Sequence, residues 1–293
     1  MDRVLHYEIA EKLGEGKNGA AWSAVDTGLQ RAVVVKELNR PDTARAEWRD
    51  DFRLLMERFN NLDDIRIARF YSLEESEGRR YLVREYVEGQ TAGDLARTAP
   101  VDYHRWLSIA LELARIVKLI HDSGLFHGNI TSSNILTDPK GGLKLVDAGL
   151  TAAEPQRLTA EQSVFLAPEL FKGGDNSPQS ELFALGAVLY HLLTGQLPRT
   201  PVATSFERFS ELEVPGLARL LLGRLLASTP EERFGSADEL IMTLQGMMSL
   251  GVEPVETGEA KKWSPTPRQW LMISILVLLL IILWLVITSN PRP

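Results

Sequence analysis

Two oxygen-bearing side chains stand on either side of a tight turn in the middle of the chain. Asn134 precedes the strand-like run Ile135–Leu136, Asp147 follows the run Leu143–Val146, and the turn Pro139–Gly142 joins the two runs. Strands joined by such a turn lie side by side, so we expect the amide and the carboxylate to converge. Carboxylate and amide oxygens are ligands that Mg²⁺ prefers. The sequence therefore predicts a magnesium site formed by Asn134 and Asp147.

A second group of residues has the spacing of a phosphate site. Gly14, Gly16 and Gly19 lie between two strand-like runs, and glycines let backbone N–H groups approach phosphate because no Cβ stands in the way. Alone this pattern is weak, and a plain hairpin turn explains it better than a phosphate site does. The β-branched run Ala32–Lys36, however, ends in a lysine 17 residues after Gly19. This order and spacing favour a phosphate-binding role for Lys36 over that of a solvated charge.

The spacing of these groups resembles the catalytic and metal-binding loops of eukaryotic-type protein kinases, most closely those of bacterial membrane-anchored Ser/Thr kinases. In that family, His-Arg-Asp is followed by an asparagine five residues after the aspartate, and then by Asp-Phe-Gly. The corresponding stretches here are His127–Asn134 and Asp147–Gly149. Ala167–Glu169 matches the Ala-Pro-Glu that closes the family's activation segment.

The resemblance also implies a structural ion pair. Thr229–Phe234 matches the family segment whose arginine pairs with the glutamate of Ala-Pro-Glu. We therefore predict a buried ion pair between Glu169 and Arg233.

The nucleotide site implied by the resemblance uses ATP and Mg²⁺ as cofactors. The glycine-rich turn, Ala21 in the strand after it, and Lys36 would hold the nucleotide and its phosphates. Tyr81–Gly89 resembles the family's hinge strand. Backbone groups of Glu85 and Val87 in this strand would hydrogen-bond adenine. The sequence leaves open whether ATP binds, because the retained metal pair favours binding and Arg84 opposes it.

Four positions depart from the family pattern where its chemistry is most demanding. Asn129 stands in place of the aspartate base, Gly128 in place of the arginine, Thr131 in place of the lysine two residues on, and Ala148 in place of the phenylalanine. An asparagine has no carboxylate to accept the proton of a substrate hydroxyl, and loss of a general base lowers the rate about 10²- to 10⁴-fold. Thr131 lacks the positive charge that would face the transferring phosphate. These departures predict an inactive or very weak enzyme.

The lysine of an active kinase is steadied by a glutamate on the next helix. Residues 43–60 predict that helix, with an apolar stripe at helical spacing, and they put Leu55 at the glutamate position. Asp51 or Glu57 could substitute for it. The ion pair that marks an active kinase is thus missing at its usual position.

Arg84 precedes the hinge, where the family has an apolar or small residue facing the back of the nucleotide pocket. Burying an unpaired guanidinium would cost several kcal/mol, so we expect a partner. Asp147 or Glu57 could pair with Arg84 and so compete with a metal ion, or Arg84 could reach a phosphate.

The resemblance implies an α+β, bilobal protein-kinase-like fold, with a small β-rich N-lobe over residues 1–88 and a helical C-lobe over residues 89–250. Within the C-lobe, the apolar periodicity of Asp102–Gly124 predicts a long amphipathic helix. Ser180–Tyr190 resembles the central C-lobe helix, with Glu181 at the place of its usual aspartate.

Composition sets broad limits on the 293-residue chain. It is 44% hydrophobic and 24% charged, which is typical of a globular protein, and its net charge of −7 argues against a nucleic-acid binder. The absence of cysteine excludes disulfides, thiolate metal sites and thiol nucleophiles.

The C-terminal part has a different composition. Trp270–Thr288 holds 19 residues without a charge, and at about 1.5 Å per residue such a helix crosses the roughly 30 Å hydrocarbon core. The sequence therefore predicts a transmembrane helix over 270–288, after a tether over 251–269 and before a tail over 289–293. Three basic residues precede this span and one follows it, which favours a cytoplasmic N-terminal domain.

The sequence leads to one main hypothesis and two alternatives. The main hypothesis is a membrane-anchored pseudokinase that acts as a scaffold or allosteric partner of cytoplasmic or membrane proteins. The first alternative is a weakly active Ser/Thr protein kinase in which another acid serves as the base. The second is a structural membrane module that binds no nucleotide. Phosphotransfer separates the first alternative from the main hypothesis, and nucleotide binding separates the second.

Overall fold

The computed structural model describes residues 3–16, 19–38, 48–138, 140–150, 158–198 and 214–250. Its strands are β1 (Arg3–Val4), β2 (Tyr7–Gly16), β3 (Gly19–Asp26), β4 (Arg31–Glu37), β5 (Phe70–Ser76), β6 (Arg79–Glu85), β7 (Gln90–Thr91), β8 (Ile135–Thr137) and β9 (Leu143–Leu145). Its helices are α1 (Trp48–Asn60), α2 (Ala92–Thr98), α3 (Tyr103–Asp122), α4 (Ala160–Ser163), α5 (Pro168–Phe171), α6 (Pro178–Thr194), α8 (Gly216–Leu225), the 3₁₀ turn η3 (Pro230–Glu232) and α9 (Ala237–Ser249).

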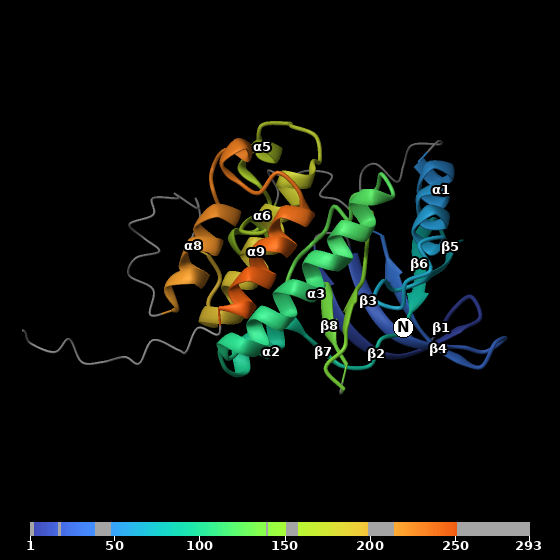
Figure 1. Ribbon diagram of the computed structural model, residues 1–293. Coiled ribbons are helices and arrows are strands. Elements are labelled where there is room, and N and C mark those ends of the chain that lie inside the picture. Colours follow the sequence, from blue (N-terminus) through green and yellow to red (C-terminus); the bar gives the residue numbers. More distant parts are fainter. Residues whose placement is uncertain are drawn as a thin grey trace, which may run out of the picture. The chain divides into compact units, whose positions relative to one another are not determined.

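The N-terminal part is an antiparallel sheet with the strand order β1-β2-β3-β4-β6-β5, next to which α1 lies (Figure 1). Side chains alternate between the two faces of a strand. On one face, Val33 and Val35 of β4 pack with Tyr81 and Val83 of β6 in a small apolar cluster. The opposite face of these two strands therefore presents the residues in between, and it carries the polar groups of the site described below.

Helix α1 packs through three buried side chains, Phe52, Met56 and Phe59, which recur at helical spacing. Phe59 meets Phe70 of β5 in an edge-to-face contact with ring centroids 6.3 Å apart. The helix begins at Trp48 in the structure. The first residues of the helix predicted over 43–60 lie outside the described residues.

The C-terminal part is helical, and its long helix α3 packs against α6 and α9 (Figure 1). Asp102 caps the start of α3, where its carboxylate accepts the Arg105 N–H at 3.1 Å. Trp106 is fully buried, and its indole N–H donates to the Leu189 carbonyl of α6 at 2.8 Å. The predicted helices over Asp102–Gly124 and Ser180–Tyr190 correspond to α3 and α6.

The two parts are joined by backbone contacts to the three-stranded sheet β7-β8-β9. The Ala68 N–H donates to the Leu145 carbonyl, and the Leu145 N–H donates to the Arg66 carbonyl, each at 2.8 Å. These bonds attach the segment between α1 and β5 to β9. The strand β9 leads directly to Asp147.

The bilobal α+β fold predicted from the sequence is confirmed by this arrangement. The predicted membrane span over 270–288, the tether over 251–269 and the tail over 289–293 lie outside the described residues. Within the described ranges, no helix combines the length and the apolar character needed to cross a bilayer.

Candidate functional site

Hydrogen bonds join the predicted catalytic loop, His127–Asn134, to the predicted metal loop, Asp147–Gly149. The Gly149 N–H donates to the His127 carbonyl at 2.8 Å, and the Val146 N–H donates to the Asn134 carbonyl at 2.9 Å. The second bond extends the pairing of β8 with β9 by one step. The chain thus brings Asn134 and Asp147 into neighbouring positions, as the turn between the strands predicts.

Asn129, at the position of the family's base, is held by the same two loops. Its side-chain Nδ2 donates to the Asp147 backbone carbonyl at 3.3 Å, and its own carbonyl accepts from Asn134 Nδ2 at 2.8 Å. Thr131 is half-buried, and its hydroxyl pairs with that of Ser133 at 2.9 Å. Neither side chain carries an ionisable group.

The Asp147 carboxylate is the electrostatic centre of the site. It is 4% exposed, and its backbone has a φ of 59°, in the left-handed region. Lys36 Nζ pairs with Oδ2, while Arg84 Nε donates to Oδ1 at 2.7 Å. Burial alone would raise the pKa of Asp147, but the charges of Lys36 and Arg84 and their hydrogen bonds hold this pKa well below its usual range.

Strand register explains how Lys36 and Arg84 reach the same carboxylate. Lys36 on β4 lies opposite Leu82 on β6, and Val34 lies opposite Arg84. Residues two apart on a strand share a face, so Lys36 and Arg84 project from the same side of the sheet.

Arg84 is 7% exposed and has the partner that its burial requires. Besides its bond to Asp147, its Nη1 donates to the Glu85 carbonyl at 2.9 Å. The sequence left Asp147, Glu57 or a phosphate as possible partners, and the structure selects Asp147. Glu57 is exposed on α1.

The hinge residue Glu85 is engaged by the protein on both of its backbone groups. Its carbonyl accepts from Arg84, and its N–H donates to the Arg69 carbonyl at 2.9 Å. Its side chain pairs with Lys144 of β9. Val87, the other residue predicted to bind adenine, is half-buried beyond the end of β6. The adenine-binding role of both residues stays a prediction.

Helix α1 meets the metal loop through a leucine, as the sequence predicts. An ideal Cβ on Gly149, which has a φ of +75°, would come within 2.7 Å of Leu55 Cδ2. Asp51 and Glu57 are both exposed, and in the described part of the chain neither pairs with Lys36. The alternative in which one of them replaces the missing glutamate is therefore not what the structure shows, since Asp147 holds the lysine instead.

Three of the predicted phosphate-binding residues, Gly14, Ala21 and Lys36, form one row across the sheet. Gly14 of β2 lies opposite Ala21 of β3, and Ala21 lies opposite Lys36 of β4. An ideal Cβ on Gly14 or Gly16 would meet no atom within 4 Å, so packing inside the protein does not demand glycine at either position. Gly19 has a φ of 119°, which L side chains rarely adopt. The space beside Gly14 and Gly16 could therefore accommodate a ligand.

Two buried polar groups that the sequence did not assign to the site support its loops. Glu181 on α6 accepts the backbone N–H of Gly128 and contacts His121 Nε2 at 2.9 Å. His191 Nδ1 lies 2.9 Å from the hydroxyl of Ser132. The signal in the sequence is weak. Glu181 stands in the first turn of α6 and His191 in its last turn, and neither position reveals the partner of the side chain.

An open pocket lies beside these loops. Its walls come from the loop around Asn129, from the segment between α4 and α5, and from α6. Gly128, which replaces the family's arginine, lines it with a φ of 68°.

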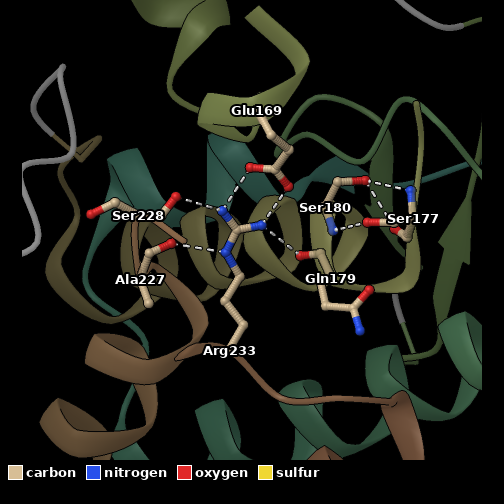
Figure 2. A network of polar contacts seen from close by, with 7 residues as sticks. All are labelled: Glu169, Ser177, Gln179, Ser180, Ala227, Ser228 and Arg233. Atoms are coloured by element: carbon tan, nitrogen blue, oxygen red, sulfur yellow. Dashed lines mark hydrogen bonds and ion pairs between the residues drawn. The ribbon is translucent and has the colours of Figure 1, made fainter. Parts of the chain in front are cut away.

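The predicted ion pair between Glu169 and Arg233 is confirmed (Figure 2). Arg233 Nη1 and Nη2 donate to the two carboxylate oxygens of Glu169 at 2.7 and 2.8 Å. Figure 2 shows the guanidinium surrounded by acceptors, and its other donors reach the backbone carbonyls of Ala227, Gln179 and Ser228 at 2.8, 3.1 and 3.2 Å. The Arg233 side chain is fully buried, whereas Glu169 is 22% exposed.

Comparison with known proteins agrees with this geometry. The protein kinase domain family matches residues 7–241. The chain belongs to this family. Among curated proteins, this kinase-family chain is 32% identical to the serine/threonine-protein kinase PrkC of Bacillus subtilis over 199 residues, covering 66% of the chain and 31% of PrkC. It is 29% identical to the serine/threonine-protein kinase PknB of Mycobacterium tuberculosis over 260 residues, covering 80% of the chain and 41% of PknB.

These relatives confirm the resemblance to bacterial Ser/Thr kinases of the eukaryotic type. The kinase-family chain spans about a third to two fifths of the length of these curated relatives. Among solved structures, the kinase domain of M. tuberculosis PknI superimposes with a TM-score of 0.68 at 25% identity, covering 85% of this chain and 99% of that domain.

Kinase-family relatives generally use ATP and Mg²⁺, and the two residues predicted to hold the metal differ in how well they fit it. Asn134 fits, because its Nδ2 donates to Asn129 and its Oδ1 remains available. Asp147 does not, because each of its carboxylate oxygens already faces a cation. As arranged, the residue pair predicted to hold the metal does not offer the carboxylate to it. Among the described residues, no cluster of three or more His, Cys, Asp or Glu side chains provides another metal site.

Proposed function

We propose that this kinase-family protein is a pseudokinase, which acts as a scaffold or allosteric partner of other proteins rather than as a phosphotransferase. The observation that carries the proposal is the pairing of Arg84 with Asp147. It places a fixed guanidinium on the carboxylate that the family uses for its metal.

The position of the base supports the same conclusion. Asn129 cannot accept a proton, and its amide donates to the Asp147 carbonyl. Loss of a general base alone lowers the rate about 10²- to 10⁴-fold. The half-buried Thr131 brings no charge to the transferring phosphate. Because these deficits act on one transition state, their effects compound.

Loading a metal on Asp147 would also require Arg84 to withdraw. Arg84 is 7% exposed, so withdrawal without a new partner would leave a buried charge uncompensated. Removing one partner of a buried pair costs about 3–5 kcal/mol, or roughly a hundred- to several-thousandfold in an equilibrium constant. The resting arrangement therefore disfavours the metal-loaded state.

The location in this proposal comes from the C-terminal sequence. The uncharged span Trp270–Thr288 would anchor the protein in a membrane, and the basic residues before it favour a cytoplasmic kinase-like domain. Partners would then be proteins in the cytoplasm or in the same membrane.

A phosphotransfer assay tests the proposal. The purified full-length chain is incubated with radiolabelled ATP, Mg²⁺ and a generic acceptor protein, beside Lys36→Met and Asp147→Asn. We expect the label on the acceptor to be the same for all three proteins. Robust labelling by the wild type that both substitutions abolish would overturn the proposal.

A weakly active Ser/Thr kinase is the second candidate, and similarity to PrkC and PknB favours it. It requires an acid other than residue 129 to serve as the base. The same assay decides between the two candidates, because weak activity that depends on Lys36 and Asp147 would support the kinase.

A further inference from the structure

We propose that the sheet face that carries Lys36 and Arg84, beside Asp147, binds a nucleoside triphosphate as the metal-free anion, with Arg84 supplying the positive charge that a divalent cation supplies in active relatives. The inference rests on the pseudokinase proposal and deepens it. It also assigns Mg²⁺ the role of a competitor at this site.

The charges on the sheet face carry the inference. Lys36 and Arg84 share one face and one carboxylate, so the cluster of these two residues with Asp147 has a net charge of +1. In the low-dielectric setting of a buried cluster this excess is weakly screened. A polyphosphate anion is attracted to this net positive charge, whereas a divalent cation is repelled by two positive groups at close range.

The guanidinium has donors left for phosphate. A guanidinium carries five N–H donors in a planar fork that matches phosphate oxygens. Arg84 uses Nε on Asp147 and Nη1 on the Glu85 carbonyl. Its Nη2 has no hydrogen-bond partner among the described residues, and it is not one of the fully buried unpaired atoms. This nitrogen is therefore available to a ligand without breaking the pair with Asp147.

The neighbouring row of small residues leaves room for that ligand. Gly14 and Ala21 lie in register with Lys36 across three strands. The space where a Cβ of Gly14 would stand is open for at least 4 Å. The phosphates of a nucleotide held by Lys36 can lie along this row.

A metal-bound nucleotide meets the opposite situation. To coordinate Asp147, the cation of the nucleotide must displace Arg84. Within the described ranges, Asp51 and Glu57 of α1, the acids that the sequence offered as other partners, are exposed to solvent. Bound magnesium also lowers the net negative charge of ATP, which weakens its attraction to the cationic cluster. The free anion is thus the preferred ligand.

Calorimetric titration of the full-length chain with ATP tests this inference. It is run once in EDTA and once in excess Mg²⁺, at equal ionic strength and pH 7.5. We expect ATP to bind at least tenfold more tightly in EDTA. Arg84→Met should weaken binding in EDTA at least tenfold and remove the preference for the metal-free form.

Arg79→Met is the matched control. Arg79 lies on the same strand, and its side chain is 59% exposed and pairs with Glu37 at 3.4 Å. Its substitution removes one arginine of β6 without touching Asp147. Binding of ATP should therefore stay at the wild-type value in both buffers.

The outcomes separate this inference from the pseudokinase proposal. Binding that requires Mg²⁺ and is unchanged by Arg84→Met would overturn the inference, and so would the absence of binding in both buffers, while the pseudokinase proposal would stand. Phosphotransfer would overturn the pseudokinase proposal itself. If Arg84→Met fails to fold, adding Mg²⁺ to the wild-type complex in EDTA decides, since release of ATP is expected and tighter binding contradicts it.

Discussion

At Asp147, pairing with Arg84 occupies a carboxylate oxygen that would otherwise be available to a metal ion. The aspartate keeps the position of a metal ligand, yet Lys36 and Arg84 take both of its oxygens. At Asn129, the change from carboxylate to amide removes the proton acceptor and keeps a hydrogen-bonding role toward the Asp147 carbonyl. The two positions thus favour a structural role for residues that drive chemistry in active kinases.

Restoring the acid alone should not restore catalysis. In Asn129→Asp, the side chain of Thr131 would still lack a positive charge, and Arg84 would still pair with Asp147. We expect phosphotransfer in the assay above to remain at the level of Asp147→Asn. The triple variant Asn129→Asp, Thr131→Lys and Arg84→Leu is the matched comparison and should gain activity. Full activity of the single variant would show that the base was the only deficit.

The pair of Glu169 with Arg233 is a second residue-scale test. Glu169→Gln leaves a fully buried guanidinium with backbone carbonyls as its main partners. We expect the free energy of unfolding to fall by about 3 kcal/mol, as measured by urea denaturation. Arg97→Gln, at an exposed pair with Asp94, should change it by less than about 0.5 kcal/mol. Equal effects of the two variants would contradict the structural role of the buried pair.

At the scale of elements, the segment after β6 passes very close to β8. Gly89 has a φ of +143°, and a Cβ there would come within 2.1 Å of the Thr137 carbonyl oxygen. A backbone oxygen cannot move aside as a flexible side chain can. The connection between the sheet and the helical part therefore depends on glycine at this position.

Gly89→Ala should destabilise the protein by about 2–4 kcal/mol, because steric overlap adds to backbone strain. Gly78→Ala is the control, since Gly78 also has a positive φ, of +74°, but its Cβ would meet no atom within 4 Å. Its cost should be about 1 kcal/mol, from strain alone. Urea denaturation measures both. Similar losses for the two variants would argue against the close approach of the segment to β8.

For the molecule as a whole, buried histidines should set the response to mild acid. His127 is completely buried, and burial lowers its pKa, partly offset by the charges of Glu181 and Asp147. Burial likewise lowers the pKa of His191. An unfolded histidine titrates near 6.5, so below this pH the unfolded chain binds more protons than the folded one. Stability should therefore fall as pH drops from 7.5 to 5.5.

Thermal melts over this pH range check the expectation. Each histidine contributes a slope of at most about 1.4 kcal/mol per pH unit. His191→Gln, which can keep a hydrogen bond to Ser132, should flatten the dependence. The lowered pKa of Asp147 acts elsewhere, since its stabilising effect is lost only as pH falls below about 4. A flat profile for the wild type would contradict the burial of neutral histidines.

The sequence by itself determined the fold, the positions of the altered catalytic residues and the pair of Glu169 with Arg233. The fold and the ion pair are implied by the resemblance of the motifs and their order to the protein kinase family, while local periodicity predicts individual helices such as α3. It also determined that Arg84 needs a partner, because a buried guanidinium cannot remain unpaired.

Only the tertiary structure decided which partner Arg84 takes and what that does to Asp147. The choice between Asp147, Glu57 and a phosphate depends on distances between β6, α1 and the loop after β9, which are far apart in the chain. Strand register places Arg84 and Lys36 on one face, and the backbone bonds of Leu145 bring the loop of Asp147 to it. Such contacts arise when separate elements pack, so no local pattern of residues encodes them.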